Sequence, residues 1–240
     1  MKRIFTGLGI LIVTNIFGQD FKRFDYQFDI GTTLTIPYKK TIESMPEVDR
    51  HPVTNYYSDF GYFLECMISY NFNKKVAINS GLNYNYSSLA INDKVGFNES
   101  KGNLTSSYLH LPVLFKYHVF DKISISVGPY VGLLISANER GTTYIDTAGF
   151  GAFGIHDPLL DAIELIQKYD KNIKDDYTDI DFGLSGQVDY ELALGEKWIG
   201  VIFSRFNYGL KNVMTNDLVN NNTATEWKNY SLMIGLGIKL

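Results

Sequence analysis

The chain has 240 residues, enough for one large domain or two small ones. Its 22 Lys and Arg against 26 Asp and Glu give a formal net charge of −4, which disfavours a basic surface for nucleic acid. A single Cys excludes a disulfide framework, and 15% aromatic with only 20% charged residues argues against disorder. The mean hydropathy of −0.09 is too polar for a bundle of membrane helices, but it suits a membrane β-barrel, whose strands are only half apolar.

The first 18 residues predict a secretory signal peptide. Lys2 and Arg3 give a positive start, residues 4–17 are mainly apolar, and the small Gly18 follows. The apolar stretch is shorter than the roughly 20 residues of a spanning helix, which favours a cleaved peptide over a membrane anchor. Cleavage after Gly18 would leave residues 19–240 as one domain with 20 basic and 26 acidic residues, a net charge of −6.

From residue 19 onward the dominant pattern is an alternation of apolar and polar residues with period two, which is typical of β-strands. In each strand one face carries Leu, Ile, Val, Phe or Tyr, and the other carries mainly Gly, Ser, Asn or charged residues. Eight strands are predicted, over residues 25–36, 61–72, 76–86, 109–119, 123–136, 180–192, 196–208 and 230–240. The seventh alternates least clearly and the eighth most clearly.

Strand length and the polar face favour a membrane barrel over a soluble β-sandwich. Many of these strands have ten residues or more, whereas soluble strands usually have about 5–6 and spanning strands about 9–11. Small and charged residues suit a polar lumen, with the apolar face turned to lipid. Aromatic residues near strand ends fit an interfacial girdle, and they include Tyr84, Tyr86, Phe206, Tyr208 and Tyr230.

The connections alternate between short and long. Those after the second, fourth and sixth strands are short, at 73–74, 120–122 and 193–196. Those after the first, third, fifth and seventh are long, at about 38–55, 91–106, 137–179 and 209–227. This is the pattern of outer-membrane barrels, with turns in the periplasm and loops outside. The predicted fold is therefore an all-β, closed, antiparallel, eight-stranded up-and-down transmembrane barrel.

The third long outer loop also carries a helix pattern. Asp157 and Pro158 provide a cap and a first-turn proline. The apolar residues that follow are Leu159, Leu160, Ile163, Leu165 and Ile166. We expect a short amphipathic helix here, which either lies over the barrel mouth or docks a partner. Loops of this length without a role are uncommon.

Several segments together resemble the PorT-like outer-membrane β-barrel family of Bacteroidetes-type bacteria. They are Tyr108-Leu109-His110-Leu111-Pro112-Val113-Leu114-Phe115-Lys116-Tyr117, Gly128-Pro129-Tyr130, Asp181-Phe182-Gly183, Arg205-Phe206-Asn207-Tyr208-Gly209-Leu210 and Gly235-Leu236-Gly237-Ile238-Lys239-Leu240. The resemblance spans nearly all of 19–240 and implies an eight-stranded barrel in the outer membrane of a Gram-negative cell. The family's namesake belongs to a protein-secretion system, and the resemblance implies no catalytic residues.

Charged residues recur on the predicted lumen side of the strands. They are Asp29, Glu65, Lys116, Asp181, Asp189, Glu191 and Arg205. An eight-stranded barrel is filled by its own side chains or holds one small ligand, and charges in its low-dielectric interior need partners. We therefore expect a structural charge network that plugs the lumen; a proton or ion path and a ligand cavity are the alternatives.

Histidines offer little for catalysis or metal binding. His110 and His118 are eight residues apart on one strand, about 27 Å at strand rise, and cannot share a metal. His51 and His156 lie in different outer loops, where they could meet Asp or Glu, but no spacing motif supports this. We expect no enzymatic activity, metal or cofactor.

The sequence thus predicts an integral outer-membrane protein with a structural or partner-binding role in the envelope, in secretion or surface assembly. Its expected partners are outer-membrane lipid and an envelope protein bound through the long outer loops, not nucleic acid. One alternative is a small-ligand carrier built as a lipocalin-like barrel, which requires the apolar faces to point inward. Another is an outer-membrane hydrolase that uses loop residues.

Overall fold

The computed structural model describes residues 23–43, 53–95, 98–145, 165–195, 197–214 and 223–240. These residues form ten β-strands and one 3-10 turn. In chain order they are β1 (Phe24–Glu43), β2 (Val53–Ser58), β3 (Phe60–Asn71), β4 (Val76–Val95), β5 (Asn98–Phe120), β6 (Ile123–Ile145), β7 (Leu165–Asn172), η2 (Lys174–Asp176), β8 (Ile180–Ala193), β9 (Ile199–Gly209) and β10 (Thr223–Lys239).

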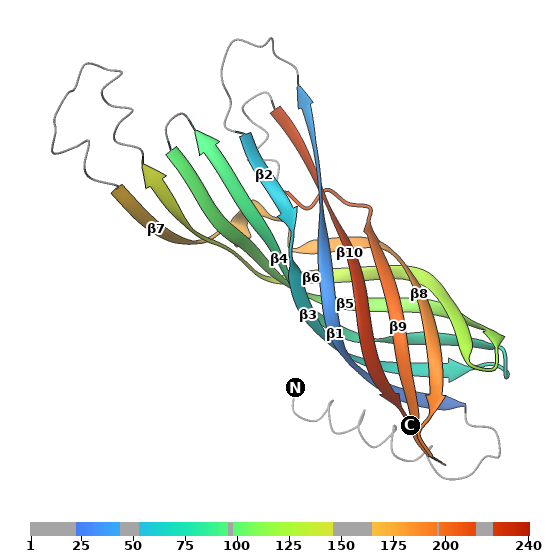
Figure 1. The fold of residues 1–240 in the computed structure, drawn as a ribbon. Coiled ribbons are helices and arrows are strands. Elements are labelled where there is room, and N and C mark those ends of the chain that lie inside the picture. The colour runs from blue at the N-terminus through green and yellow to red at the C-terminus, as the bar shows by residue number, and fades with distance from the viewer. Residues whose placement is uncertain (1–22, 44–52, 96–97, 146–164, 196, 215–222) are drawn as a thin grey trace, which may run out of the picture.

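Eight of the strands close into a ring, as the sequence predicts. The order around it is β1-β3-β4-β5-β6-β8-β9-β10, and β10 pairs again with β1. Every pairing is antiparallel. Figure 1 shows the ring as a tilted barrel. Closure matters in a bilayer because an open strand edge would leave backbone groups unpaired in hydrocarbon.

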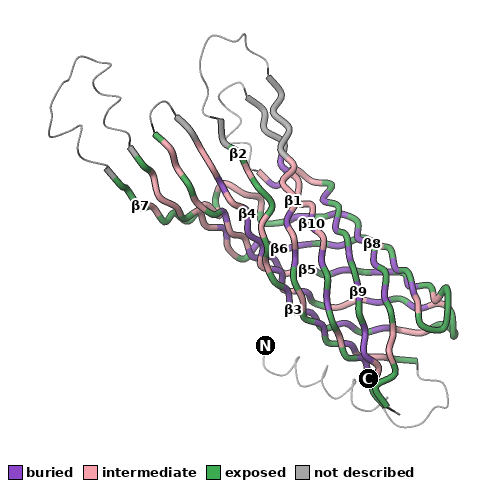
Figure 2. Tube along the Cα trace, in the orientation of Figure 1, coloured by how far each residue is buried: buried purple, intermediate pink, exposed green. Residues whose placement is uncertain are grey.

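The apolar faces of the strands point outward. Along β8 the residues alternate strictly, with Asp181 fully buried and its neighbour Phe182 47% exposed. The same alternation runs along β10, where Leu236 is 60% exposed while Met233 is fully buried. Figure 2 shows this as a regular change of colour along the barrel strands. The orientation contradicts the lipocalin-like alternative, which requires the apolar faces inside.

Tight turns join the strands at one end, as predicted. After β3, the Asn73 side-chain oxygen accepts hydrogen bonds from the backbone N–H groups of Lys75 and Val76, at 2.8 and 2.9 Å. Between β8 and β9, Gly195 has a φ of 129°, a conformation that L side chains rarely adopt.

An outer row of aromatic residues marks one boundary of the apolar wall. At the outer row the rings of Tyr62 and Tyr86 stack with centroids 5.1 Å apart, and those of Tyr208 and Tyr230 stack at 4.7 Å. On β4 the span from Val76 to Tyr86 is ten residue steps, about 25 Å in height at the usual rise and tilt. That height matches the apolar band of an outer-membrane barrel.

The long connections predicted from sequence are partly strands, which corrects their predicted extent. β4, β5 and β6 run for 20, 23 and 23 residues, far beyond the outer aromatic row. β2 continues the line of β3 after a one-residue break at Asp59, and β7 continues that of β8 after a break at 173–179. The alternation is weaker here because the two faces no longer separate lipid from lumen.

Beyond the outer aromatic row the barrel wall splits in two, as Figure 1 shows. The outer ends of β1 and β10 form a two-stranded ribbon. The other part is a five-stranded antiparallel sheet in the order β2-β4-β5-β6-β7. We call this the outer sheet; it comprises β2, residues 88–95 of β4, 98–105 of β5, 138–145 of β6, and β7.

The short helix predicted in the third long outer loop is not supported. The described residues include no α-helix, and therefore no helix that is long and apolar enough to cross a membrane. Leu165 and Ile166 of the predicted helix lie in β7, because the extended β6 offers an edge that pairs with their backbone groups. Residues 157–164 lie outside the described residues.

Candidate functional site: the filled lumen

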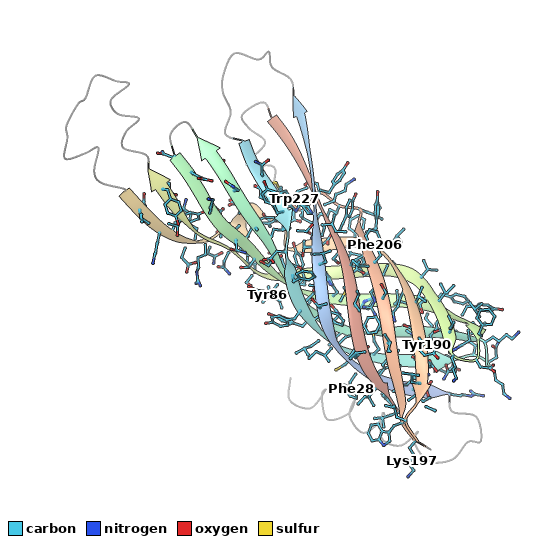
Figure 3. The ribbon with its side chains drawn as sticks, in the orientation of Figure 1. Phe28, Tyr86, Tyr190, Lys197, Phe206 and Trp227 are labelled. Atoms are coloured by element: carbon cyan, nitrogen blue, oxygen red, sulfur yellow. The ribbon has the colours of Figure 1, made fainter. Side chains whose placement is uncertain are left out.

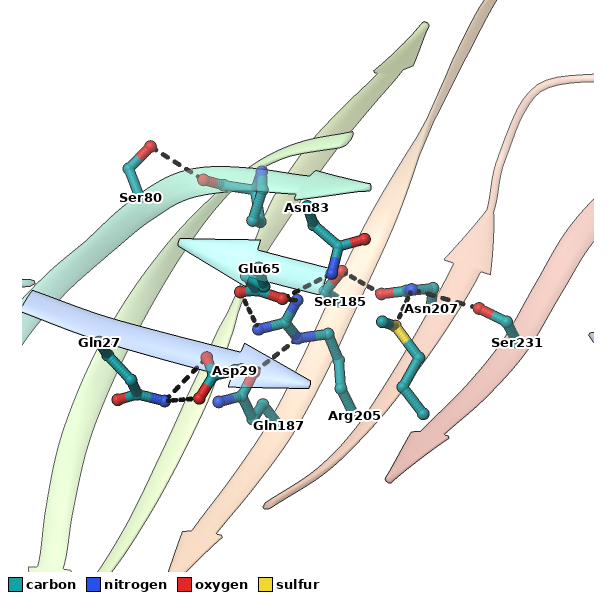
Figure 4. Close-up of polar contacts among 12 residues, drawn as sticks. Gln27, Asp29, Glu65, Ser80, Asn83, Ser185, Gln187, Arg205, Asn207 and Ser231 are labelled. Atoms are coloured by element: carbon teal, nitrogen blue, oxygen red, sulfur yellow. Dashed lines mark hydrogen bonds and ion pairs between the residues drawn. The ribbon is translucent and has the colours of Figure 1, made fainter. Parts of the chain in front are cut away.

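Arg205 lies at the centre of a buried cluster that crosses the barrel. Its two terminal nitrogens each donate to a different oxygen of Glu65, both at 2.7 Å, and its Nε donates to Gln187 at 2.5 Å. Asn83 donates to the same carboxylate at 2.6 Å. Figure 4 shows these groups converging from β9, β3, β8 and β4. The bidentate geometry is the strongest form of an Arg–carboxylate pair.

A second cluster lies nearer the periplasmic turns. Lys116 Nζ is 3.0 Å from an oxygen of Asp189 and 3.4 Å from one of Glu191. Lys239 Nζ is 2.7 Å from Glu191, and the Ser124 hydroxyl donates to Asp189 at 3.0 Å. Gln187 connects the two clusters because its amide also donates to Asp189, at 2.5 Å.

The other two carboxylates of the predicted set are held by neutral groups. Asp29 accepts two hydrogen bonds from Gln27, at 2.8 and 3.0 Å. Asp181, towards the outer end, accepts from the Asn229 amide at 3.0 Å and the Tyr130 hydroxyl at 3.3 Å. The structure therefore pairs five of the seven predicted residues with an opposite charge and binds these two through amides and a hydroxyl.

Sequence reasoning overlooked part of this cluster. Lys239 lies on the inward side of the last strand, and its position in the alternation could have identified it. Asn83 and Gln187 also lie on inward faces, but an amide in a barrel strand gives no separate sequence signal. Glu65 lies opposite Asn83 and Arg205 lies opposite Gln187 on a neighbouring strand, so the strand register determines which charges these amides contact.

The lumen also contains apolar layers, although its predicted character was polar. Phe63, Val201, Phe203 and Met233 form a fully buried group next to the Arg205 cluster. Gly235 makes room for the two rings: a Cβ there would lie 2.6 Å from the Phe63 ring and 2.7 Å from the Phe203 ring. Aromatic side chains thus fill the middle of the barrel at a position where glycine leaves space.

An apolar cluster closes the outer mouth. Its buried members come from β4, β5, β10 and the segment after β9, and they are Leu89, Ile91, Leu104, Val213 and Trp227. Tyr177, in the break between β7 and β8, packs against them, and its backbone forms a bridge with Met214. The break at 173–179 therefore folds inward over the lumen. Figure 3 labels Trp227 at this end of the barrel.

A small cavity lies beneath the mouth cluster. Its volume is about 30 Å³, room for about two water molecules. Its lining includes His110, Tyr108, Tyr130 and Asn207. His110 is stacked on Tyr108 and meets Tyr130 edge-on, so its ring is held as a packing element. The cavity is far smaller than the 300–1,000 Å³ of typical ligand pockets.

The described residues contain no group of three His, Cys, Asp or Glu side chains that could hold a metal ion. His110 and His118 lie on the same strand, β5, at its middle and near its periplasmic end. His51 and His156, which the hydrolase alternative requires, lie outside the described residues.

A closed antiparallel ring that is apolar outside and filled inside defines an integral β-barrel of the outer membrane. The chain belongs to the outer membrane protein β-barrel domain family, whose model matches residues 17–215. It is a protein of the outer membrane, where the exposed apolar wall faces lipid. No curated protein matches the chain.

Solved structures with a similar fold are also outer-membrane proteins. OprG from Pseudomonas aeruginosa is 14% identical, with a TM-score of 0.44, and the match covers 90% of this chain and 95% of OprG. Ail from Yersinia pestis is 12% identical, with a TM-score of 0.35 over 90% and 98% of the two chains. The protease OmpT from Escherichia coli is 7% identical, with a TM-score of 0.35 over 94% and 99%. At these scores none of the three indicates a function for this chain.

Proposed function

We propose that this protein is a sealed, non-enzymatic outer-membrane anchor that presents its outer sheet and loops to a protein partner of the cell envelope. The observation that carries the proposal is the contrast between the two ends of the molecule. The lumen is filled by buried ion pairs and apolar layers, whereas β5 and β6, each 23 residues long in total, extend beyond the barrel into a sheet outside the membrane. A barrel that served only to conduct solutes would need an open lumen, and it would have no need of a sheet outside the membrane.

We assign the lumen charges a structural role in this anchor. Charges in a low-dielectric interior are tolerated when they are paired and hydrogen-bonded, and ring closure brings such pairs together. Glu65 and Arg205 connect β3 with β9, and Lys116 and Asp189 connect β5 with β8. Each pair joins strands that are not neighbours in the ring, so it links parts of the wall that share no backbone ladder.

More specifically, we propose that the protein is related to the PorT-like family and that it acts in secretion or surface assembly. The segment Tyr108–Tyr117, one of the segments on which that resemblance rests, lies in β5 and forms part of the barrel wall. We also propose that residues 1–18 are removed as a signal peptide; mass spectrometry of the purified protein would identify its first residue as Gln19.

Site-specific photo-crosslinking in living cells tests the partner-binding role. A photoreactive residue at Gln167 of β7 or Asn98 of β5 should give a discrete adduct of the same mass in repeated experiments. The matched control places the same residue at Lys74, in a periplasmic turn. If both outer positions gave no adduct, or if the control gave the same one, the proposed role of the outer sheet would be wrong.

Conductance in planar lipid bilayers tests the sealed lumen. The intact protein should show no steady open-channel current, because the mouth cluster and the charge clusters both obstruct the lumen. Replacing Trp227 and Tyr177 with Ala should not by itself create a stable pore, since the Arg205 cluster still fills the barrel. A steady, large conductance of the unmodified protein would contradict the proposal.

A further inference from the structure

The outward face of the outer sheet changes character abruptly above the membrane. Residues directly opposite one another in an antiparallel pair share a face, so the register traces this face from the lipid zone upward. Tyr84 and Leu109 are opposite one another on the lipid-facing wall. Four residues further along each strand, Ser88 and Thr105 are opposite, and after another four, Asn92 and Lys101. The same face is therefore apolar in the bilayer and polar outside it.

Three polar rows cross this face, each running over β4, β5, β6 and β7. The lowest row is Ser88, Thr105, Asn138 and Asn172; the middle row is Ala90, Asn103, Arg140 and Asp170; the upper row is Asn92, Lys101, Thr142 and Lys168. Amides and hydroxyls dominate the lowest row, whereas the upper row carries two cations and no acid.

All residues of these rows except Asn172 line a hollow of about 1330 Å³. Tyr57 and Tyr86 lie at its base, next to the outer aromatic row to which Tyr86 belongs. Figure 3 labels Tyr86 on the outer wall of the barrel, where the outer sheet begins to splay. The hollow therefore opens on the side of the barrel that faces the surrounding membrane.

The charged groups of the hollow are exposed and can exchange partners. Lys101 is 3.1 Å from Glu99, with 57% of the lysine side chain exposed. Arg140 is 2.6 Å from Asp170, with exposures of 77% and 57%. Exposed ion pairs of this kind contribute little to stability, so an anionic ligand can compete for the cations.

A further acidic residue near the base of the hollow, Asp59, already accepts hydrogen bonds from neighbouring side chains. Asp59, at the break between β2 and β3, accepts hydrogen bonds from the Ser88 hydroxyl at 2.6 Å and the Asn103 amide at 3.2 Å. These two hydrogen bonds connect its carboxylate to the lowest and middle rows. In the upper row Lys101 and Lys168 lie on either side of Thr142, on strands about 10 Å apart. Two flexible lysines at this separation can reach one anionic group between them.

We propose that this hollow binds the anionic saccharide headgroup of a glycolipid in the outer leaflet. Lys101 and Lys168 hold the anionic group, while Asn103, Asn138 and Thr105 hydrogen-bond with sugar hydroxyls. The acyl chains of the same lipid lie on the apolar wall directly below. The proposal commits to a membrane lipid because the polar rows continue the lipid-facing surface of the same strands.

The height of the cations favours a saccharide headgroup over that of a phospholipid. From Tyr86 to Asn92 there are six residue steps, about 20 Å along the strand and about 14 Å in height at a tilt of about 45°. The phosphate of a phospholipid lies near the aromatic row and would not reach the upper row. A headgroup of several sugars spans that height.

Glycolipid binding by the full-length protein in nanodiscs tests this inference. The probe is lipopolysaccharide, titrated into discs of phospholipid, with retained glycolipid measured by native mass spectrometry. The test variant is the double substitution Lys101→Gln and Lys168→Gln. The matched control is Lys171→Gln, which changes a lysine on the same strand as Lys168 but on the opposite face of the sheet.

The expected result is a 20- to 30-fold weaker affinity in the double variant, at about five-fold for each surface lysine, and unchanged affinity in the control. Heat-modifiable migration in gels verifies that each variant is folded. Equal affinity in all proteins, or no preference for lipopolysaccharide over phospholipid, would overturn the proposal. A delipidated soluble headgroup saccharide that bound as tightly as the intact glycolipid would also overturn it, because the ligand would then come from solution.

Discussion

Replacing Arg205 with Ala should destabilise the barrel more than any other loss of a single charge. The substitution leaves Glu65 buried without its cation and Gln187 without its donor. Breaking a buried ion pair from one side lowers the free energy of unfolding by about 3–5 kcal/mol, because the remaining charge loses both water and partner. The whole cluster is at most 4% exposed, so solvent cannot replace the lost guanidinium.

A double-mutant cycle separates the pair from general damage to the barrel. Glu65→Met and Arg205→Met are measured singly and together, since replacing both partners by apolar residues is often nearly neutral. The double variant should be at least about 2 kcal/mol more stable than the sum of the single losses predicts. It should not recover fully, because Asn83 and Gln187 lose their acceptor and donor.

The assay is urea unfolding of the protein in lipid vesicles, followed by the fluorescence of the two tryptophans. Arg140→Ala is the matched control, because that arginine also makes a 2.6 Å contact with an aspartate but is exposed. It should change the free energy of unfolding by less than about 1 kcal/mol. A similar loss in both variants, or strict additivity in the cycle, would refute the assignment of Arg205 to the centre of a structural network.

Three further predictions follow from the barrel geometry. Gly235→Ala should destabilise the protein by about 1–3 kcal/mol because its Cβ would overlap two buried rings, whereas Gly186→Ala, with no atom within 4 Å of its new Cβ, should have no measurable effect in the same unfolding assay. Leu236→Lys places a charge on the lipid-facing wall and should cost about 2–4 kcal/mol, detectable as a lower urea midpoint; an unchanged midpoint would contradict the outward orientation. Hydrogen bonds from the Ser88 hydroxyl and, to a smaller extent, from the backbone N–H of Phe60 lower the pKa of Asp59 below its usual value. The carboxylate therefore stabilises the folded protein above about pH 4, the pKa in the unfolded chain, and this stabilisation is lost as the pH falls through the lower pKa of the folded state. Amide exchange around the break between β2 and β3 should therefore accelerate only at strongly acidic pH, and Asp59→Asn should remove that dependence.

The arrangement of the outer sheet was beyond the reach of sequence reasoning. The long connections carry strand segments such as β7, which pairs with the outer end of β6. A helix pattern over 157–166 competed with this strand, and Leu165 and Ile166 joined β6 because its extended edge was available for pairing. Local periodicity does not reveal which edge a segment will meet.

The candidate lumen site was also predicted only in part from the sequence. Alternation identified seven charged residues on inward faces, but it did not identify Lys239 as a partner of Glu191 or Asn83 as a partner of Glu65. The first contact crosses one intervening strand, β9, and the second joins neighbouring strands, so both depend on the strand register. The hollow on the outer sheet likewise follows from register, since each of its three rows combines residues from four successive strands.

The sequence by itself determined the class of this protein: period-two alternation, strand length and the alternation of short and long connections are local properties, and a bilayer imposes them on every spanning strand. Only the tertiary structure decided which side chains meet, because ring closure and register bring together residues such as Glu65 and Arg205 that are 140 positions apart. The filling of the lumen, the closure of its mouth and the polar hollow outside the membrane all depend on those long-range pairings.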